Sequence, residues 1–275
     1  MTPIVSAGWL SERIDDPMLR VADCRWYLGE PLRGRSTYGA GHIPGAVFVD
    51  LETDLSAAEG PGRHPLPLPA DFATRLGRLG IGNRHAVVAY DDRGGAIASR
   101  LWRMLTALGH EAAAVLDGGL QAWVAHGGAT TTDTAEPEQA AYVTDSVAWP
   151  GTVDRLQLGR RLGTVDLIDA RAANRFVGSE EPIDPVAGHI PTARNVPQEG
   201  NLTADGRFAD PSLLAVRYGK GDLPPVVYCG SGVTACHDIL AMEIAGLGRA
   251  TLYPGSWSDW SSNGGAVETG DPAGN

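Results

Sequence analysis

A buried strand, a loop of small residues and a helix follow one another in the stretch Val226-Val227-Tyr228-Cys229-Gly230-Ser231-Gly232-Val233-Thr234-Ala235-Cys236-His237. A cysteine at such a strand-to-helix turn faces the unpaired N–H groups of the helix and the positive end of its dipole. That environment favours the thiolate, which is the reactive form. Gly230 and Gly232 allow several N–H groups to point inward as an anion nest. The stretch therefore predicts Cys229 as a catalytic nucleophile; a buried structural cysteine would not explain the glycine loop behind it.

The pattern around this stretch occurs twice in the chain. A strand ending in Asp-x-Arg occurs at Asp23 and again at Asp169, and a Gly-His-Ile-Pro turn follows at Gly41 and at Gly188. Further landmarks repeat in the same order, with Asp91 in the position that Cys229 takes in the second copy. The offset is about 146 residues before this point and about 138 after it, and such constancy indicates a duplicated domain.

Strands alternate with helical patterns in both copies, which predicts an α/β fold. We expect two tandem domains, each a mostly parallel sheet flanked by helices. The predicted ranges are residues 1–128 for a non-catalytic domain, 129–142 for a linker without apolar periodicity, and 143–275 for the catalytic domain. In the first copy, the clearest expected elements are strands at 86–90 and 113–116 and helices at 70–79 and 96–108.

The composition excludes several classes of protein. The chain has 275 residues, 43% of them apolar and 20% charged, as is ordinary for a globular protein. Its net charge of −11 argues against a nucleic-acid or anionic-membrane surface. A membrane span and a secretory signal are not indicated. The three cysteines make neither a disulfide framework nor a metal pair, which suits the cytoplasm.

Taken together, these motifs resemble the tandem-domain rhodanese family of thiosulfate and 3-mercaptopyruvate sulfurtransferases. The resemblance extends over nearly the whole chain and rests on these segments: Asp23-Cys24-Arg25, Gly41-His42-Ile43-Pro44-Gly45-Ala46, Leu116-Asp117-Gly118-Gly119-Leu120, Asp169-Ala170-Arg171, Gly188-His189-Ile190-Pro191, the Cys229 loop and Gly255-Ser256-Trp257. It implies an active site in the second domain, no cofactor or metal, and a cysteine that cycles through a persulfide. The Cys229 loop is similar to that of the mercaptopyruvate-type members, because Gly230 and Ser231 stand where thiosulfate-type members often carry basic residues.

The implied reaction moves a sulfur atom from 3-mercaptopyruvate to a thiophilic acceptor. The Cys229 thiolate attacks the sulfur of this small anionic donor, and a thiol, a thioredoxin-like protein or cyanide then removes it. We expect the main-chain N–H groups of the loop to hold the persulfide anion; the residues assigned to this are Gly230, Gly232, Val233 and Thr234. Ser231 is expected to contact the leaving group or to relay a proton to it.

Two charged positions bear on donor binding. Arg175 stands where the family places an arginine that binds the anionic donor, and a planar guanidinium suits a carboxylate or a sulfonate-like group. Mercaptopyruvate-type members commonly carry a second arginine at the position of Asp184. A carboxylate there is expected to weaken binding of a small keto-acid anion.

The remaining candidates are assigned mainly structural roles. His42 is a candidate interdomain partner for the site, since some family members are proposed to use a Ser-His-Asp arrangement, but its repetition at His189 favours a structural role. Arg25 and Arg171 are expected to pair with the aspartates two residues before them. Cys236 and His237, on the helix after the loop, are expected to be packed.

Three alternatives stay open to different degrees. Cysteine phosphatases need an arginine six positions after the nucleophile, where this chain has Ala235. A thiosulfate:cyanide sulfurtransferase would use the same nucleophile with another donor. A non-catalytic sulfur carrier or binding module is the more distant alternative.

Overall fold

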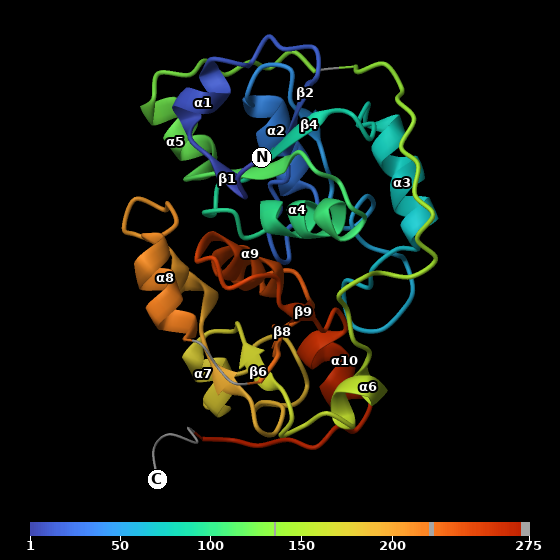
Figure 1. Cartoon of the computed structure of the whole chain (residues 1–275), viewed down its shortest axis with the longest axis vertical. Coiled ribbons are helices and arrows are strands. Elements are labelled where there is room, and N and C mark those ends of the chain that lie inside the picture. Colours follow the sequence, from blue (N-terminus) through green and yellow to red (C-terminus); the bar gives the residue numbers. More distant parts are fainter. Residues whose placement is uncertain (135, 220–222, 271–275) are drawn as a thin grey trace. The chain divides into compact units, whose positions relative to one another are not determined.

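The structure is a computed structural model, and it describes residues 1–134, 136–219 and 223–270. The chain forms two compact units (Figure 1). Unit 1 comprises Met1–Ala57, Pro67–Pro150 and Thr203–Phe208, and unit 2 comprises Ala58–Leu66, Gly151–Leu202 and Ala209–Asn275. The boundary between the units thus follows Pro150, after the linker expected at 129–142. The loop Ala58–Leu66 belongs to unit 2, although the sequence around it belongs to unit 1. Positions 271–275 of the expected catalytic range lie outside the described residues.

Unit 1 is a five-stranded parallel sheet with the strand order β1-β5-β4-β2-β3. Its strands are β1 (Ile4–Val5), β2 (Leu19–Asp23), β3 (Val47–Phe48), β4 (Ala86–Tyr90) and β5 (Ala113–Leu116). Its helices are α1 (Ala7–Ser11), α2 (Arg33–Ala40), α3 (Pro69–Arg78), α4 (Ala98–Ala107) and α5 (Gly119–Ala125). The strands predicted at 86–90 and 113–116 are confirmed, and the predicted helices agree within two residues at each end.

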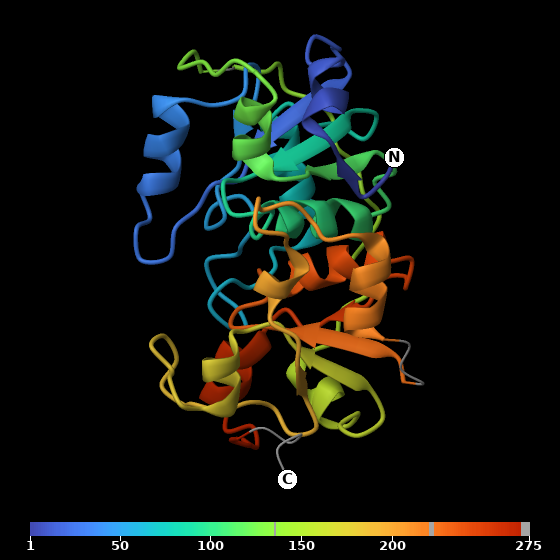
Figure 2. The ribbon, with the colours of Figure 1, turned by 90° about the vertical axis from the view of Figure 1, so that its left-hand side faces the viewer.

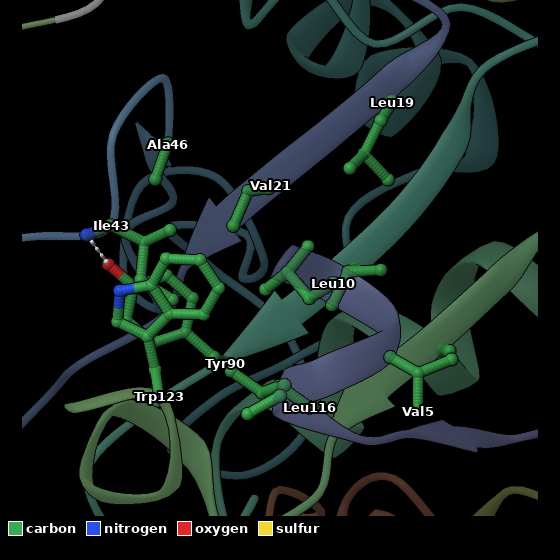
Figure 3. Close-up of a cluster of buried hydrophobic side chains, with 12 residues drawn as sticks. Val5, Leu10, Leu19, Val21, Ile43, Ala46, Tyr90, Leu116 and Trp123 are labelled. Atoms are coloured by element: carbon green, nitrogen blue, oxygen red, sulfur yellow. Dashed lines mark hydrogen bonds between the residues drawn. The ribbon is translucent and has the colours of Figure 1, made fainter. Parts of the chain in front are cut away.

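Alternate strand residues of unit 1 face one core. Leu19 and Val21 of β2 and Val88 and Tyr90 of β4 pack with Leu10 of α1 and Trp123 of α5, among others. Since successive side chains of a strand point to opposite faces, the intervening residues of β4 lie on the other face of the sheet, and α4 contacts β4 and β5. Figure 3 shows this cluster and the hydrogen bond of 3.2 Å from the Ile43 N–H to the Tyr90 hydroxyl.

Unit 2 is a four-stranded parallel sheet with the order β7-β6-β8-β9. Its strands are β6 (Asp166–Asp169), β7 (Arg194–Asn195), β8 (Pro225–Tyr228) and β9 (Thr251–Leu252). Its helices are α6 (Arg155–Gly159), α7 (Ala173–Val177), the 3-10 turn η1 (Gln198–Asn201), α8 (Pro211–Tyr218), α9 (Ala235–Ile244) and α10 (Ser256–Ser262). Helices α8 and α9 lie side by side (Figure 2), whereas α6, α7 and α10 contribute Leu158, Phe176 and Trp257 to a core with Val226 and Tyr228.

The repeat predicted from the sequence is present in the contacts of both units. Arg25 binds Asp23 with a shortest distance of 2.6 Å and donates to the Gly41 carbonyl, and Arg171 does the same with Asp169 and Gly188. The internal pairing expected for both arginines is therefore confirmed. Breaking either buried pair by removing one partner would leave an uncompensated charge in the core.

Both sheets are thus mostly parallel and covered by helices, as the sequence predicts. No helix in the described ranges has the length and apolar character needed to cross a bilayer.

Candidate active site

Cys229 stands at the carboxyl end of β8, and its main chain is tied to α10. Its N–H donates to Ser256 Oγ at 3.1 Å, and its carbonyl accepts from Trp257 N at 2.9 Å. The thiol is only 2% exposed, and its Sγ accepts the Gly232 N–H at 3.1 Å. Gly232 has a φ of +75°, and a Cβ there would collide with the Pro254 carbonyl, so glycine is required at this point of the loop.

The rest of the loop leads into α9. At the start of the helix, the N–H of Cys236 donates to the Val233 carbonyl and the N–H of His237 donates to the Thr234 carbonyl. The Gly230 carbonyl accepts the N–H of Ser258 in α10. Of the N–H groups expected to hold an anion, that of Gly232 already donates to the thiol. The assignments of Gly230, Val233 and Thr234 to anion binding remain predictions.

The corresponding loop of unit 1 holds a carboxylate in place of the thiol. Asp91 Oδ1 accepts N–H bonds from Arg93 and Gly95, and Oδ2 accepts them from Ile97 and Ala98, all at 2.8–2.9 Å. The terminal oxygen of an aspartate is as many bonds from Cα as the terminal sulfur of a cysteine persulfide. The strand-loop-helix geometry repeated in this chain is therefore able to bind a negative charge at that distance from the backbone.

Asp91→Ala is expected to destabilise unit 1 by about 3 kcal/mol or more, because three buried N–H groups and one partly buried N–H group lose their acceptor. The measurement is denaturant unfolding followed by tryptophan fluorescence. Asp15→Ala, at an exposed aspartate of the same unit, is the matched control and is expected to unfold like the parent chain. Equal unfolding midpoints for the two variants would contradict the role given to the Asp91 carboxylate.

Ser231 is hydrogen-bonded to a histidine that the sequence analysis did not select. His64 Nδ1 lies 2.8 Å from Ser231 Oγ, although the two residues are 167 positions apart. His64 lies in the loop Ala58–Leu66, which belongs to unit 2. Gly62 in this loop has a φ of +79°, and a Cβ atom at this position would collide with the Gly255 carbonyl. Two positions after Cys229, the loop therefore presents a hydroxyl in contact with an imidazole, a pair able to relay a proton.

His42 takes a structural place instead. Its ring is fully buried in unit 1, stacked on Tyr38 with ring centroids 3.8 Å apart. Its nitrogens lie 2.8 Å from the Tyr38 carbonyl and 3.1 Å from that of Asp133. His189 repeats this arrangement with Phe176 in unit 2. The histidine that pairs with Ser231 is thus His64. His42 has a packing role common to both units, and its interdomain role remains a prediction.

Arg175 projects from α7 into a cluster of charges. Its Nη2 binds Glu181 at 2.7 Å and Asp184 at 3.1 Å. Although burial alone would raise the pKa of Glu181, hydrogen bonds from Arg175 and from the Asp184 main chain hold that pKa below its ordinary value. Asp184 is 4% exposed and also accepts from Arg63 Nη1, so its carboxylate is paired with two guanidinium groups. The Asp184 carboxylate, which was expected to weaken binding of an anion, is therefore paired with two positive charges in the structure.

The packing expected for Cys236 and His237 is confirmed. Both are fully buried; Cys236 Sγ donates to the Gly232 carbonyl at 3.3 Å, and His237 Nδ1 lies 3.2 Å from Asn201 Nδ2. The next residue, Asp238, accepts from the same Asn201 amide at 2.8 Å. Burial raises the pKa of Asp238 to about 7, although this hydrogen bond opposes the shift. These side chains support α9 behind the loop.

Comparison with known proteins agrees with the geometry. The rhodanese-like domain matches this chain twice, over residues 6–126 and 152–263. The chain is 44% identical over 271 residues to a probable 3-mercaptopyruvate sulfurtransferase of Pseudomonas aeruginosa, with 94% of each chain covered. It is 42% identical over 277 residues to a putative thiosulfate sulfurtransferase, SseB, of Mycobacterium tuberculosis, again with 94% of each covered.

A solved structure gives the same result for the fold. The crystal structure of SseA from Escherichia coli, presented as a 3-mercaptopyruvate sulfotransferase, aligns with a TM-score of 0.82 and 33% identity and covers 94% of this chain and 100% of its own. The duplicated sheets and the family matches converge on one assignment. The chain belongs to the rhodanese family, with two rhodanese-like domains, and is a sulfurtransferase.

Proposed function

We propose that this sulfurtransferase takes a sulfur atom from 3-mercaptopyruvate and passes it, through a persulfide on Cys229, to a thiophilic acceptor. Catalysis is assigned to unit 2, since unit 1 has Asp91 at the corresponding position. The observation that carries the donor assignment is the Ser231–His64 hydrogen bond of 2.8 Å beside the nucleophile. It supports a donor whose leaving group needs a proton.

In the first step, the Cys229 thiolate attacks the donor sulfur and forms an S–S bond. The C–S bond of 3-mercaptopyruvate breaks, and its electron pair goes to carbon, giving the enolate of pyruvate. Ser231 Oγ delivers a proton to the enolate carbon and is itself reprotonated by His64. His64 regains its proton from the S–H group of the donor sulfur, which leaves the persulfide as an anion. The products are Cys229–S–S⁻ and pyruvate.

The persulfide anion is then held by loop N–H groups. The Gly232 N–H already donates to Sγ, and the N–H groups of Ser231 and Val233 are the sequence counterparts of those of Arg93 and Gly95, which bind the Asp91 carboxylate. In the second step, a thiophilic nucleophile attacks the outer sulfur, and the electrons of the S–S bond return to Cys229. A small thiol, a thioredoxin-like protein and cyanide are all acceptors of this kind.

Thiosulfate is the second candidate donor. Its outer sulfur can be attacked in the same way with sulfite as the leaving group, which needs no proton from Ser231. The observation that favours it is the pair of guanidinium groups of Arg63 and Arg175, which suits a dianion.

Steady-state rates with both donors, at equal acceptor concentration, distinguish the two candidates. We expect the higher kcat/KM with 3-mercaptopyruvate and a mass gain of one sulfur atom on the peptide that contains Cys229. A higher kcat/KM with thiosulfate would overturn the donor assignment but leave the persulfide in place. No mass gain with either donor would favour a non-catalytic binding module.

A further inference from the structure

Two guanidinium groups lie against the residue that follows the nucleophile. A Cβ atom placed on Gly230 would lie 2.9 Å from Arg63 Nη2 and 3.4 Å from Arg175 Nη1. The two arginines come from different parts of unit 2, the loop Ala58–Leu66 and helix α7. The absence of a side chain at Gly230 therefore lets both guanidinium groups approach the main chain next to Cys229.

Asp184 fixes the direction of both guanidinium groups. Its Oδ1 accepts from Arg63 Nη1 and its Oδ2 accepts from Arg175 Nη2 at 3.1 Å, whereas Glu181 accepts from Nε and Nη2 of Arg175. The main-chain N–H of Arg63 donates to Ser258 Oγ at 3.1 Å, which anchors the loop itself. These contacts use Nη1 of Arg63 and Nε and Nη2 of Arg175, whereas Arg63 Nη2 and Arg175 Nη1 lie toward Gly230.

The remaining donors are suitable for a ligand. Among the described residues, the hydrogen bonds made by the Arg63 and Arg175 side chains use neither Arg63 Nη2 nor Arg175 Nη1, and Arg63 Nε is buried without a partner. The Arg63 side chain is 30% exposed and that of Arg175 is 15% exposed, so a small molecule can reach them. Nε and Nη2 of Arg63 and Nη1 of Arg175 are thus the N–H donors left for the oxygens of a carboxylate or a sulfonate-like group.

We propose that Arg63 is a specificity-determining residue that binds the oxyanion group of the sulfur donor together with Arg175. This inference rests on the proposed function, because it concerns the donor of the same site. Asp184 then acts on the donor only through the two arginines. A carboxylate at position 184 is compatible with binding of an anionic donor because Arg63 supplies a second guanidinium.

Arg63→Gln tests this directly, since glutamine removes the charge and the forked donors while keeping a polar side chain. KM for 3-mercaptopyruvate is expected to rise about 10- to 100-fold, the size of a lost hydrogen bond between charged groups. kcat is expected to change less than about threefold, because Arg63 binds the donor's charge and not the reacting sulfur. Arg249→Gln, at a half-exposed arginine of unit 2 that pairs with Glu243, is the matched control and should keep the parent KM.

Arg63→Lys covers the case in which the glutamine variant does not fold. It keeps the charge but loses the second N–H edge, so KM is expected to rise at least about threefold and less than in Arg63→Gln. Equilibrium binding of 3-mercaptopyruvate to Cys229→Ser chains, with and without Arg63→Gln, gives a readout independent of turnover. The dissociation constant should rise by the same factor as KM.

The outcomes separate the two proposals. If the parent chain is active and both Arg63→Gln and Arg63→Lys keep its KM for the donor, the role of Arg63 is overturned but the proposed function is not. A parent chain that turns over neither donor and gains no sulfur on Cys229 would overturn the proposed function. In that case an unchanged dissociation constant in the Arg63→Gln, Cys229→Ser chain would refute the role of Arg63 as well.

Discussion

Replacing Cys229 by serine is expected to abolish sulfur transfer from both donors, with a loss in kcat of at least about 10³-fold. A hydroxyl is not ionised at neutral pH, and its oxygen does not form a persulfide with either donor. The variant is expected to fold normally, because the small hydroxyl fits the buried site and can accept the Gly232 N–H that now binds Sγ. Steady-state assays and intact mass after donor treatment measure the two effects.

The other cysteines supply the control for this experiment. Cys24→Ser, in unit 1, changes a buried thiol whose Sγ lies 3.9 Å from the Ala22 carbonyl, and it should keep full activity and still gain one sulfur atom. Cys236 is also buried, behind the loop, with its thiol directed at the Gly232 carbonyl. Sulfur found on Cys236 or Cys24 in the Cys229→Ser chain would contradict the assignment of a single nucleophile.

The fold could be predicted because its signals are local and occur twice. The short apolar runs at 86–90 and 113–116 predict strands by their length and composition, and the structure has them with the same bounds. The pairing of Arg25 with Asp23 could be predicted because the two residues are only two positions apart and the same pattern occurs at Arg171 and Asp169. Cys229 could be proposed as the nucleophile in the same way, because strand, loop and helix are contiguous.

The partners of the nucleophile loop could not be predicted in this way. His64 reaches Ser231 across 167 positions and Arg63 reaches Asp184 across 121, and no periodicity marks such contacts. Both residues lie in a segment rich in proline and glycine that reads as a connector, so its burial against unit 2 is a tertiary effect. The sequence signal that could have indicated a functional role for this loop is the run Gly62-Arg63-His64-Pro65, which places a cation and an imidazole in a loop otherwise rich in proline and glycine. His42 was considered instead, although its repetition at His189 indicated a structural role.

The Ser231–His64 pair is expected to matter for one donor and not for the other. Ser231→Ala should lower kcat with 3-mercaptopyruvate about 100-fold, the size of a lost proton-transfer step, because the pyruvate enolate must be protonated as it leaves. With thiosulfate the same variant should lose less than about threefold, because sulfite leaves without a proton. His64→Gln should give the same donor-dependent loss, and the double variant should be no slower than either single one, as expected for two residues that act as a unit.

A structural role for the pair would give a different result. If Ser231 only shaped the loop, Ser231→Ala would lower kcat equally with both donors, because Cys229 is the nucleophile in each reaction. Ser262→Ala, at an exposed serine of α10, controls for the loss of a hydroxyl in unit 2 and should leave both rates unchanged. The ratio of kcat with 3-mercaptopyruvate to kcat with thiosulfate is therefore the decisive quantity. It should fall at least about 30-fold in Ser231→Ala and in His64→Gln, since the proton relay is required only where the leaving group is a carbon base.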